Sequence, residues 1–219
     1  MNTIVELRSG DASARLVPAA GGRISALRLC RPDGYAVEVL HPYPEDFFDP
    51  LRWAKGGIYP LIPYSNRIAN AQLQVDGQTI AIAPHPDSLP HSLHGNAHAQ
   101  AWLIERSDAS SATMSLDSPA SAAWPWDYTA QITLQLSPGA LHITMTLRNA
   151  DTRAMPAGIG LHPYFRHEPT AQIGYHATTA WPANSEFLPG QPRPPPPDEL
   201  YAPERALPPG GLTDYVGGW

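Results

Sequence analysis

Three short segments of the sequence combine side chains that could bind hydroxyl groups or transfer protons with proline and aromatic residues. They are residues 56–68 (GGIYPLIPYSNRI), 91–96 (HSLHGN) and 158–165 (GIGLHPYF). A monosaccharide presents apolar C–H faces and a rim of hydroxyls, so aromatic surfaces with convergent polar groups suit it. Each segment alone is as typical of a proline-stiffened turn, but the three together favour a sugar site.

The histidines raise a second interpretation, a metal site, because His91, His94 and His98 follow the spacing H-x2-H-x3-H. This spacing has no acidic or thiolate companion nearby, and it matches neither the H-E-x-x-H motif nor a Cys/His zinc set. The cupin pattern of two histidines one residue apart, followed by a glutamate, is also missing around His94. A metalloenzyme using these histidines stays open as an alternative, but we expect no bound metal and no cofactor.

Covalent catalysis and phosphate binding find little support in the sequence. No G-x-S-x-G elbow is present, and Cys30 lies in an apolar strand pattern with Leu27 and Leu29, where a thiol is usually inert. The glycine pairs at 21–22 and 56–57 belong to neither a Walker sequence nor a G-x-G-x-x-G sequence, so they are interpreted as turns.

The charge balance excludes polyanionic partners. The 219 residues include 14 basic and 20 acidic side chains, which gives a net charge of −6, and Lys55 is the single lysine. No basic footprint for nucleic acid or anionic lipid is therefore present. No apolar run approaches the roughly 18 residues of a membrane-spanning helix, and the N-terminus lacks the pattern of a signal peptide. We expect a cytoplasmic protein that contacts neither nucleic acid nor a membrane.

The elements that position these segments are expected to be mostly β-strands, because 26 prolines and 17 glycines leave few windows for a helix. Asp76-Gly77, between apolar alternation at 73–75 and 79–82, predicts a hairpin with a type I′ turn. Period-two alternation on both sides of residues 137–139 predicts a second antiparallel pair with one buried face. Shorter strands are expected at residues 4–8, 23–29, 36–40, 102–106 and 113–116. Many short strands joined by turns are typical of a β-sandwich.

Two long segments, residues 41–66 and 83–98, show no clean periodicity, and loops of that length are usually functional or disordered. Their aromatic content favours order. Nine prolines lie between residues 189 and 209, which predicts an extended or polyproline II connection on the surface. We interpret this stretch as part of a single domain over residues 1–219.

The three segments resemble, in order and approximate spacing, the signature blocks of the aldose 1-epimerase, or galactose mutarotase, family. The matching residues are Pro-Tyr-Ser-Asn-Arg-Ile at 63–68, Leu-His-Gly at 93–95 and Leu-His-Pro-Tyr-Phe at 161–165, with Met-Pro-Ala-Gly at 155–158 leading into the third block. Residues 212–219 are similar to a fourth block, usually Leu-Asp-Asp followed by an aromatic residue and Gly-Trp. The resemblance extends over most of the chain, from about residue 21 to 219.

This resemblance implies an all-β fold, a large antiparallel β-sandwich of the galactose mutarotase-like type. It also implies interconversion of the α and β anomers of a free aldohexose of the galactose or glucose type, without a cofactor. By position, His162 resembles the family's general acid, which protonates the ring oxygen. Arg67 and His94 resemble substrate-orienting residues, Asp214 resembles a carboxylate that holds sugar hydroxyls, and Asn66 resembles a further binding residue. Histidine chemistry fits the acid role, because its ordinary pKa of about 6.5 allows proton transfer near neutral pH.

One departure from the family pattern bears on this expectation. The family's general base is a glutamate on a strand well after the Gly-Trp block, and further strands follow it, whereas this sequence ends at Trp219. We therefore expect a sandwich that is incomplete at its C-terminus, and the alternative function is a non-catalytic carbohydrate-binding β-sandwich. Missing strands would leave a sheet edge exposed, which favours self-association.

Overall fold

The computed structural model describes residues 3–46, 48–52, 55–208 and 213–218. In these residues the regular structure consists of β-strands and one-turn 3-10 helices, and none of them lies in an α-helix. By its internal contacts the chain divides into two compact units, Met1–Arg166 and His167–Trp219. The expectation of a single domain over residues 1–219 stays a prediction. Among the described residues no helix is long and apolar enough to cross a membrane.

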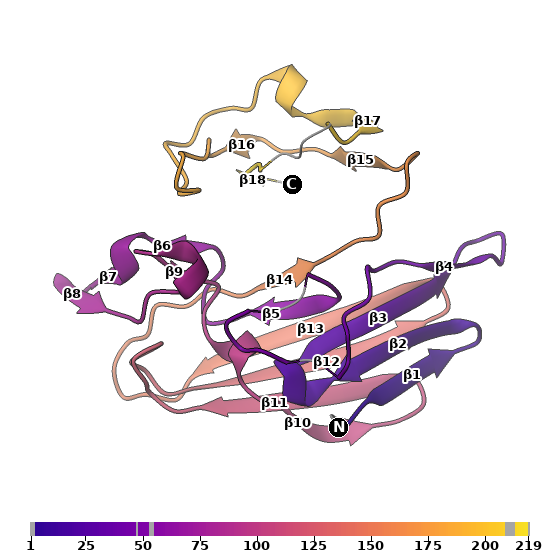
Figure 1. Ribbon diagram of the computed structural model, residues 1–219, viewed down its shortest axis with the longest axis horizontal. Helices are drawn as coiled ribbons and strands as arrows, with labels where there is room; N and C mark the ends of the chain where they lie inside the picture. The colour runs from indigo at the N-terminus through magenta and orange to yellow at the C-terminus, as the bar shows by residue number, and fades with distance from the viewer. Residues whose placement is uncertain (1–2, 47, 53–54, 209–212, 219) are drawn as a thin grey trace. The chain divides into compact units, whose positions relative to one another are not determined.

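The first unit contains a six-stranded antiparallel sheet (Figure 1). Its strand order is β1-β2-β3-β5-β14, with β4 paired to the end of β3. The bounds are β1 (Val5–Ser9), β2 (Ala12–Val17), β3 (Arg23–Cys30), β4 (Ala36–Glu38), β5 (Ile58–Leu61) and β14 (Gly160–Pro163). Because β14 comes last in sequence and pairs with β5, the sheet joins residues that are about a hundred positions apart along the chain.

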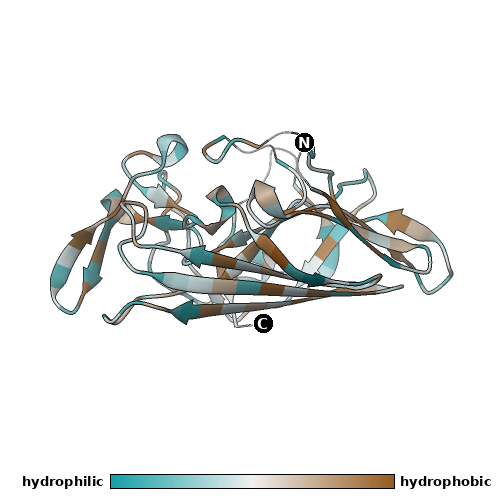
Figure 2. Cartoon of the chain, turned by 90° about the horizontal axis from the view of Figure 1, so that it is seen from below, coloured by the Kyte–Doolittle hydropathy of each residue, from teal (hydrophilic) through white to brown (hydrophobic). Residues whose placement is uncertain are grey.

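A four-stranded antiparallel sheet forms the second layer of this unit, in the order β10-β11-β12-β13. The bounds are β10 (Leu103–Ser107), β11 (Ser111–Ser118), β12 (Tyr128–Ser137) and β13 (Ala140–Asn149). The predicted pair around residues 137–139 is confirmed as the β12–β13 hairpin. In β12 the apolar residues from Tyr128 to Leu136 are buried at every second position, as a strand with one face on the core requires. Figure 2 shows apolar and polar residues alternating along several strands.

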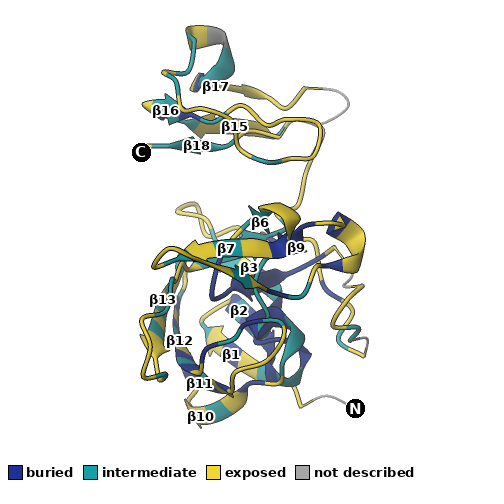
Figure 3. Ribbon diagram, turned by 90° about the vertical axis from the view of Figure 1, so that its left-hand side faces the viewer, coloured by how far each residue is buried: buried dark blue, intermediate teal, exposed yellow. Residues whose placement is uncertain are grey.

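The apolar faces of the two sheets share one hydrophobic core. Leu7, Leu16 and Ile24 from the first sheet belong to the same buried cluster as Met114 and Leu134 from the second. Figure 3 shows the buried residues gathered in the strands of the two sheets. The all-β, antiparallel sandwich expected from the sequence is therefore confirmed.

Two short strand pairs and four single-turn helices lie between the main strands of the first unit. The strand pairs are β6 (Arg67–Ile68) with β9 (Ser92–Leu93), and β7 (Gln72–Val75) with β8 (Gln78–Ala81). The helices are η1 (Pro18–Ala20), η2 (Ala69–Ala71), η3 (Pro86–Ser88) and η4 (Ala97–Ala99). The β7–β8 hairpin has φ of 49° at Asp76 and 75° at Gly77, which confirms the hairpin predicted there, with the two positive φ angles of a type I′ turn.

The second unit contains two small antiparallel pairs. One joins β15 (Gln172–Tyr175) to β17 (Tyr201–Ala206), and the other joins β16 (Thr179–Ala180) to β18 (Val216–Gly217). The single turn η5 (Pro197–Glu199) precedes β17. Within residues 189–209, which were expected to be an extended surface connection, Tyr201–Ala206 form the mostly exposed strand β17, and this strand pairs with β15.

Two strands of the first sheet differ from the sequence expectations. Strand β2 was not expected, because two of its four buried positions are Ala12 and Ala14, which give a weak strand signal. Strand β5 lies in the segment expected to be a long loop, because all four of its residues are buried and so show no alternation. The shorter strands that were expected appear as β1, β3, β4, β10 and β11, with ends shifted by one or more residues.

Candidate active site

His162 lies on β14, and its imidazole stacks on two tyrosine rings that are themselves neighbours, with centroids 6.3 Å apart. Tyr59 is its direct cross-strand partner on β5, and the two rings stack with centroids 4.9 Å apart and planes inclined by 10°. On β14's continuation the Tyr164 ring stacks on His162 at 4.8 Å and 27°. The Tyr164 N–H donates to the carbonyl oxygen of Gly57 at 2.9 Å, which fixes the backbone of that residue beside β5. Aromatic packing thus sets the orientation of the His162 ring.

His94 meets the edge of His162. Their centroids are 5.4 Å apart and their planes are inclined by 77°. The backbone N–H of His94 donates to the carbonyl oxygen of Asn66 at 2.9 Å. The backbone N–H of Asn66 donates to Nδ1 of the His94 ring at 3.1 Å. Since Nδ1 accepts this bond, the neutral imidazole carries its proton on Nε2. His94 can therefore donate a hydrogen bond through Nε2.

A tight turn holds His94 in this position. His94 and Gly95 both have positive φ, 63° and 69°, and the Ile62 carbonyl oxygen accepts hydrogen bonds from Asn96 N and Ala97 N. A Cβ at Gly95 would lie 2.1 Å from that same carbonyl oxygen. Only glycine fits there, both for its φ and for this close approach.

Burial keeps two of the histidines at this site, His94 and His98, uncharged. It lowers the pKa of His94 to about 3, with the charges of His162, His98 and Arg67 acting in the same direction. Burial also lowers the pKa of His98, on η4, to about 3, with Arg23 adding to the effect, while a hydrogen bond to the His94 backbone opposes it. The His98 ring lies 5.5 Å from that of Tyr59. Both histidines are therefore neutral near pH 7.

His162 is less perturbed than these two neighbours. Burial lowers the pKa of His162, a hydrogen bond between its ring and its own backbone raises it, and the charge of Arg23 lowers it. Its Nδ1 atom is buried and makes no hydrogen bond to another residue in the described part of the chain. His162 is thus the histidine of this cluster that combines a half-buried ring with the mildest shift of its pKa.

Arg67, the first residue of β6, and Asn66, just before it, lie beside His94. Arg67 pairs with Leu93 on β9, next to His94, and its Nε donates to Ser88 Oγ at 2.9 Å. Asn66 contributes its backbone, which anchors His94 as described above. The structure therefore brings together His162, His94, Arg67 and Asn66. Their roles toward a sugar stay predictions.

The described residues give no support to the alternative of a metal site at His91, His94 and His98. No group of three or more His, Cys, Asp or Glu side chains there is arranged to hold a metal ion. His91 and His94 each use Nδ1 to accept a backbone N–H, from Asn70 at 3.0 Å and from Asn66 at 3.1 Å.

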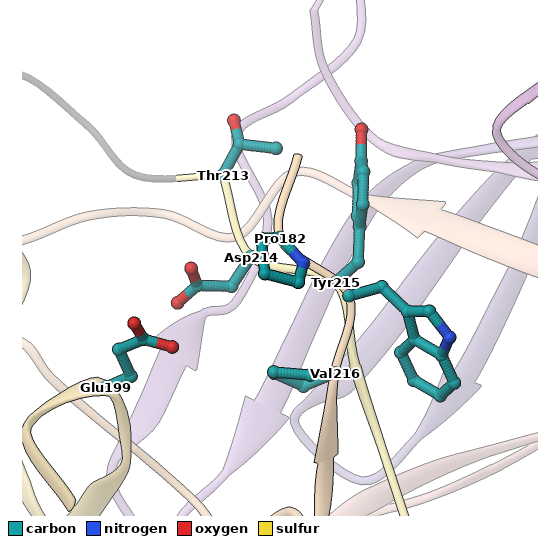
Figure 4. Close-up of a pocket in the computed structure, with 8 residues that line it drawn as sticks. Pro182, Glu199, Thr213, Asp214, Tyr215 and Val216 are labelled. Carbon is teal, nitrogen blue, oxygen red and sulfur yellow. The ribbon is translucent and has the colours of Figure 1, made fainter. Parts of the chain in front are cut away.

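Asp214, the expected carboxylate for sugar hydroxyls, belongs to the second unit. Tyr175 donates its hydroxyl hydrogen to Asp214 Oδ2 at 3.1 Å. Burial and the bond to Asp214 raise the pKa of Tyr175 to about 12, so the phenol stays protonated as a donor. Asp214 and Tyr215 line a hollow of about 20 Å³ with Glu199 and Pro182 (Figure 4). That volume holds about one water molecule, so this hollow alone is too small for a sugar. Leu212 and Trp219 of the fourth block lie outside the described residues.

Sequence reasoning did not single out Tyr59, Tyr164 or Arg23 as site residues. The first two lie inside segments 56–68 and 158–165, the same segments that contain the expected Arg67 and His162, and that was the available signal. Arg23 follows the Gly21-Gly22 pair, where only a turn was expected.

The fold is thus an antiparallel β-sandwich in which a histidine stacks on two tyrosine rings, beside a second histidine and an arginine. The sequence model of the family described as aldose 1-epimerase matches residues 3–203. The chain therefore belongs to the aldose 1-epimerase family.

Two curated relatives from one organism match part of the chain. The Escherichia coli K12 protein YphB is 24% identical over 133 residues, which cover 61% of this chain and 45% of YphB. YihR of the same organism is 31% identical over 105 residues, which cover 48% of this chain and 34% of YihR. The chain thus matches less than half the length of these curated relatives.

Solved structures share the fold. The GalM/aldose epimerase homologue from Caenorhabditis elegans superposes with a TM-score of 0.73 at 20% identity, covering 89% of this chain and 62% of that one. A galactose mutarotase-like protein from Clostridium acetobutylicum gives a TM-score of 0.74 at 18% identity, covering 90% and 63%.

Proposed function

We propose that this chain carries the acid and the sugar-orienting groups of an aldose 1-epimerase that acts on a free aldohexose of the galactose or glucose type. The observation that supports the proposal best is the stacking of His162 on the rings of Tyr59 and Tyr164, with His94 at its edge. Stacked rings fix the direction in which the imidazole presents its second nitrogen. A positioned acid of this kind contributes about 10²- to 10⁴-fold to a rate.

In the proposed reaction His162 acts through Nε2, because Nδ1 is buried. The Nε2 proton passes to the ring oxygen of the sugar while a base removes the proton of the anomeric hydroxyl. The bond between the anomeric carbon and the ring oxygen breaks, and an open-chain aldehyde forms. Rotation about the adjacent carbon–carbon bond and reversal of both proton transfers close the ring as the other anomer. His162 therefore gives a proton on opening and takes it back on closure.

His94 and Arg67 serve binding in this proposal. Neutral His94 donates its Nε2–H to a sugar oxygen, since Nδ1 is held by Asn66. Arg67 donates to Ser88 through Nε, and a guanidinium carries five N–H donors in all, which suits it to bind hydroxyl oxygens. Asp214 is proposed to accept from sugar hydroxyls, with Tyr175 orienting its carboxylate.

The group that accepts the anomeric proton is a carboxylate or water in this scheme. Glu199 is held by Arg193, whose Nη2 lies 2.7 and 2.8 Å from the two carboxylate oxygens. Without a positioned base the rate would be lower by about 10²- to 10⁴-fold, while sugar binding would persist.

Polarimetry on freshly dissolved α-glucose and α-galactose tests the proposal, with NMR exchange spectroscopy between anomers for slow rates. We expect wild-type protein to accelerate mutarotation above buffer and His162→Gln to lose most of that acceleration. His142→Gln, on an exposed position of β13, is the matched control and should behave as wild type. Equal rates for wild type and His162→Gln contradict the acid role. Sugar binding by calorimetry without any turnover would instead support the non-catalytic alternative.

Self-association is the remaining partner proposal, with a second copy of the chain as the partner. β13 and β14 each end a sheet with one side unpaired among the described strands. Analytical ultracentrifugation should show a concentration-dependent dimer. A monomer at all concentrations contradicts it.

A further inference from the structure

Arg23, at the start of β3, is buried to 0% exposure. Its guanidinium carbon lies 4.3 Å from the centroid of the Tyr43 ring and 4.6 Å from that of Tyr59. The side chain is therefore enclosed by the faces of two tyrosines.

No carboxylate balances this charge in the described part of the chain. Arg23 Nε lies 3.4 Å from the Ala20 carbonyl oxygen, Nη1 lies 3.5 Å from that of Gly56, and Nη2 is buried without a hydrogen-bond partner. Burying a charge is costly, and the two cation–π contacts offset part of that cost. An apolar residue at position 23 would stabilise the fold at least as well as arginine. The cost of burying the Arg23 charge therefore points to a role of this residue in the site.

The strand order places Tyr59 between Arg23 and His162. Ile24 pairs with Ile58 across β3 and β5, so the next register position sets Arg23 opposite Tyr59. Across β5 and β14, Tyr59 pairs with His162. The three side chains thus stand in one cross-strand row on three adjacent strands, with Arg23 on one side of Tyr59 and His162 on the other.

We propose that Arg23 is a positioning residue for His162. Its guanidinium holds the Tyr59 ring on which the imidazole stacks, and it places a buried positive charge beside the proton-transferring group. The catalytic meaning of this inference rests on the proposed function.

The charge favours the neutral form of His162. The groups that face the imidazole are Tyr59 from β5, Tyr164 after β14 and His94 after β9, and none of these is anionic at neutral pH. Of these three residues, His98 and Arg23, Arg23 is the one that carries a permanent charge. Burial is the largest cause of the lowered pKa of His162, and the charge of Arg23 acts in the same direction, so both make the imidazolium a stronger acid toward a weakly basic ring oxygen. The same charge eases release of the proton each time the ring opens.

An NMR titration of the His162 ring, assigned by comparison with His162→Gln, tests the inference without requiring turnover. We expect the midpoint to move to higher pH in Arg23→Met and Arg23→Gln, which lack the charge. Arg23→Lys keeps the charge and should keep the midpoint low. Arg28→Gln removes an exposed arginine from the same strand and is the matched control. A purely structural role of Arg23 would move the midpoint in Arg23→Lys as well.

A second measurement uses the wild-type protein, in case the uncharged variants do not fold. Salt screens exposed charges within about 10 Å at 0.1 M but affects buried ones much less. We therefore expect the His162 midpoint to stay constant as salt is raised from low to high concentration. A midpoint that rises with salt, or that is unchanged in folded Arg23→Met, overturns the inference. A shifted midpoint in a protein without mutarotase activity would refute the proposed function and leave the coupling of Arg23 to His162 intact.

Discussion

Asn66 and His94 hold each other by two hydrogen bonds, one in each direction. The His94 N–H donates to the Asn66 carbonyl oxygen, and the Asn66 N–H donates to His94 Nδ1. Both residues adopt positive φ, 59° and 63°. A backbone amide thus selects the tautomer of an imidazole in the site, which carboxylates commonly do elsewhere.

We predict that His94 stays neutral and protonated on Nε2 across the physiological range. Its pKa is lowered to about 3 by burial, so protonation should begin only in strong acid. Two-bond ¹⁵N–¹H correlation spectra should show an unprotonated Nδ1 and a protonated Nε2 down to about pH 4. A His94 spectrum that titrates near its ordinary value of about 6.5 contradicts this.

Acid should destabilise the fold through His98. The folded protein holds the pKa of His98 near 3, whereas the unfolded chain has its ordinary value of about 6.5. Below pH 6.5 the unfolded state therefore binds a proton that the folded state does not. The stability contribution is complete above pH 6.5 and is lost as the pH falls toward 3, by about 1.4 kcal/mol per pH unit.

Urea denaturation between about pH 4 and pH 6 measures this loss. In His98→Gln the unfolding free energy should depend less steeply on pH than in wild type, by the slope that corresponds to about one proton. His142→Gln, at an exposed position, should keep the wild-type slope. An unchanged slope in His98→Gln refutes the assignment.

Gly95→Ala should be far more costly than Gly77→Ala. Both glycines have positive φ, 69° and 75°, so alanine strains each by about 1 kcal/mol. A Cβ at Gly95 would also lie 2.1 Å from the Ile62 carbonyl oxygen, whereas one at Gly77 meets nothing within 4 Å. We expect Gly95→Ala to lose about 3 kcal/mol or more of unfolding free energy. Similar losses in the two variants would show that the close approach relaxes at little cost.

Arg67→Lys should weaken sugar binding with little effect on kcat. Lysine cannot keep the Nε bond to Ser88 while directing a fork of N–H groups at hydroxyls, and a charged hydrogen bond contributes about 1.5–3 kcal/mol. KM should rise by about tenfold or more. Arg106→Lys is the control, since Arg106 on β10 makes a similar Nε bond to Thr113 Oγ1 at 3.0 Å outside the site. Unchanged KM in Arg67→Lys contradicts the binding role.

The sequence allowed prediction of those elements in which local chemistry decides the structure. Asp76-Gly77 specifies its turn by the φ angles it tolerates, and the alternation through Tyr128 and Leu136 specifies a strand with one buried face. Strand β5 lies beyond such rules, because it is buried on both faces and contains Pro60.

The same distinction applies to the site. His162, His94 and Arg67 were expected from family-like blocks, and the structure brings them together. The row of Arg23, Tyr59 and His162 depends on the register of three strands. Register of that kind between distant segments is a tertiary property, and no short-range pattern in the sequence reports it.

The insertion of one whole sheet between β5 and β14 has a consequence for biosynthesis. All four strands of the second sheet are made after Leu61 and before Gly160. At about 5–20 residues per second, the ribosome needs roughly 5–20 s to cover that interval. During this time a nascent chain carries Arg23 and Tyr59 without His162 beside them, so the proton-transferring residue joins the sheet only when its last strand emerges.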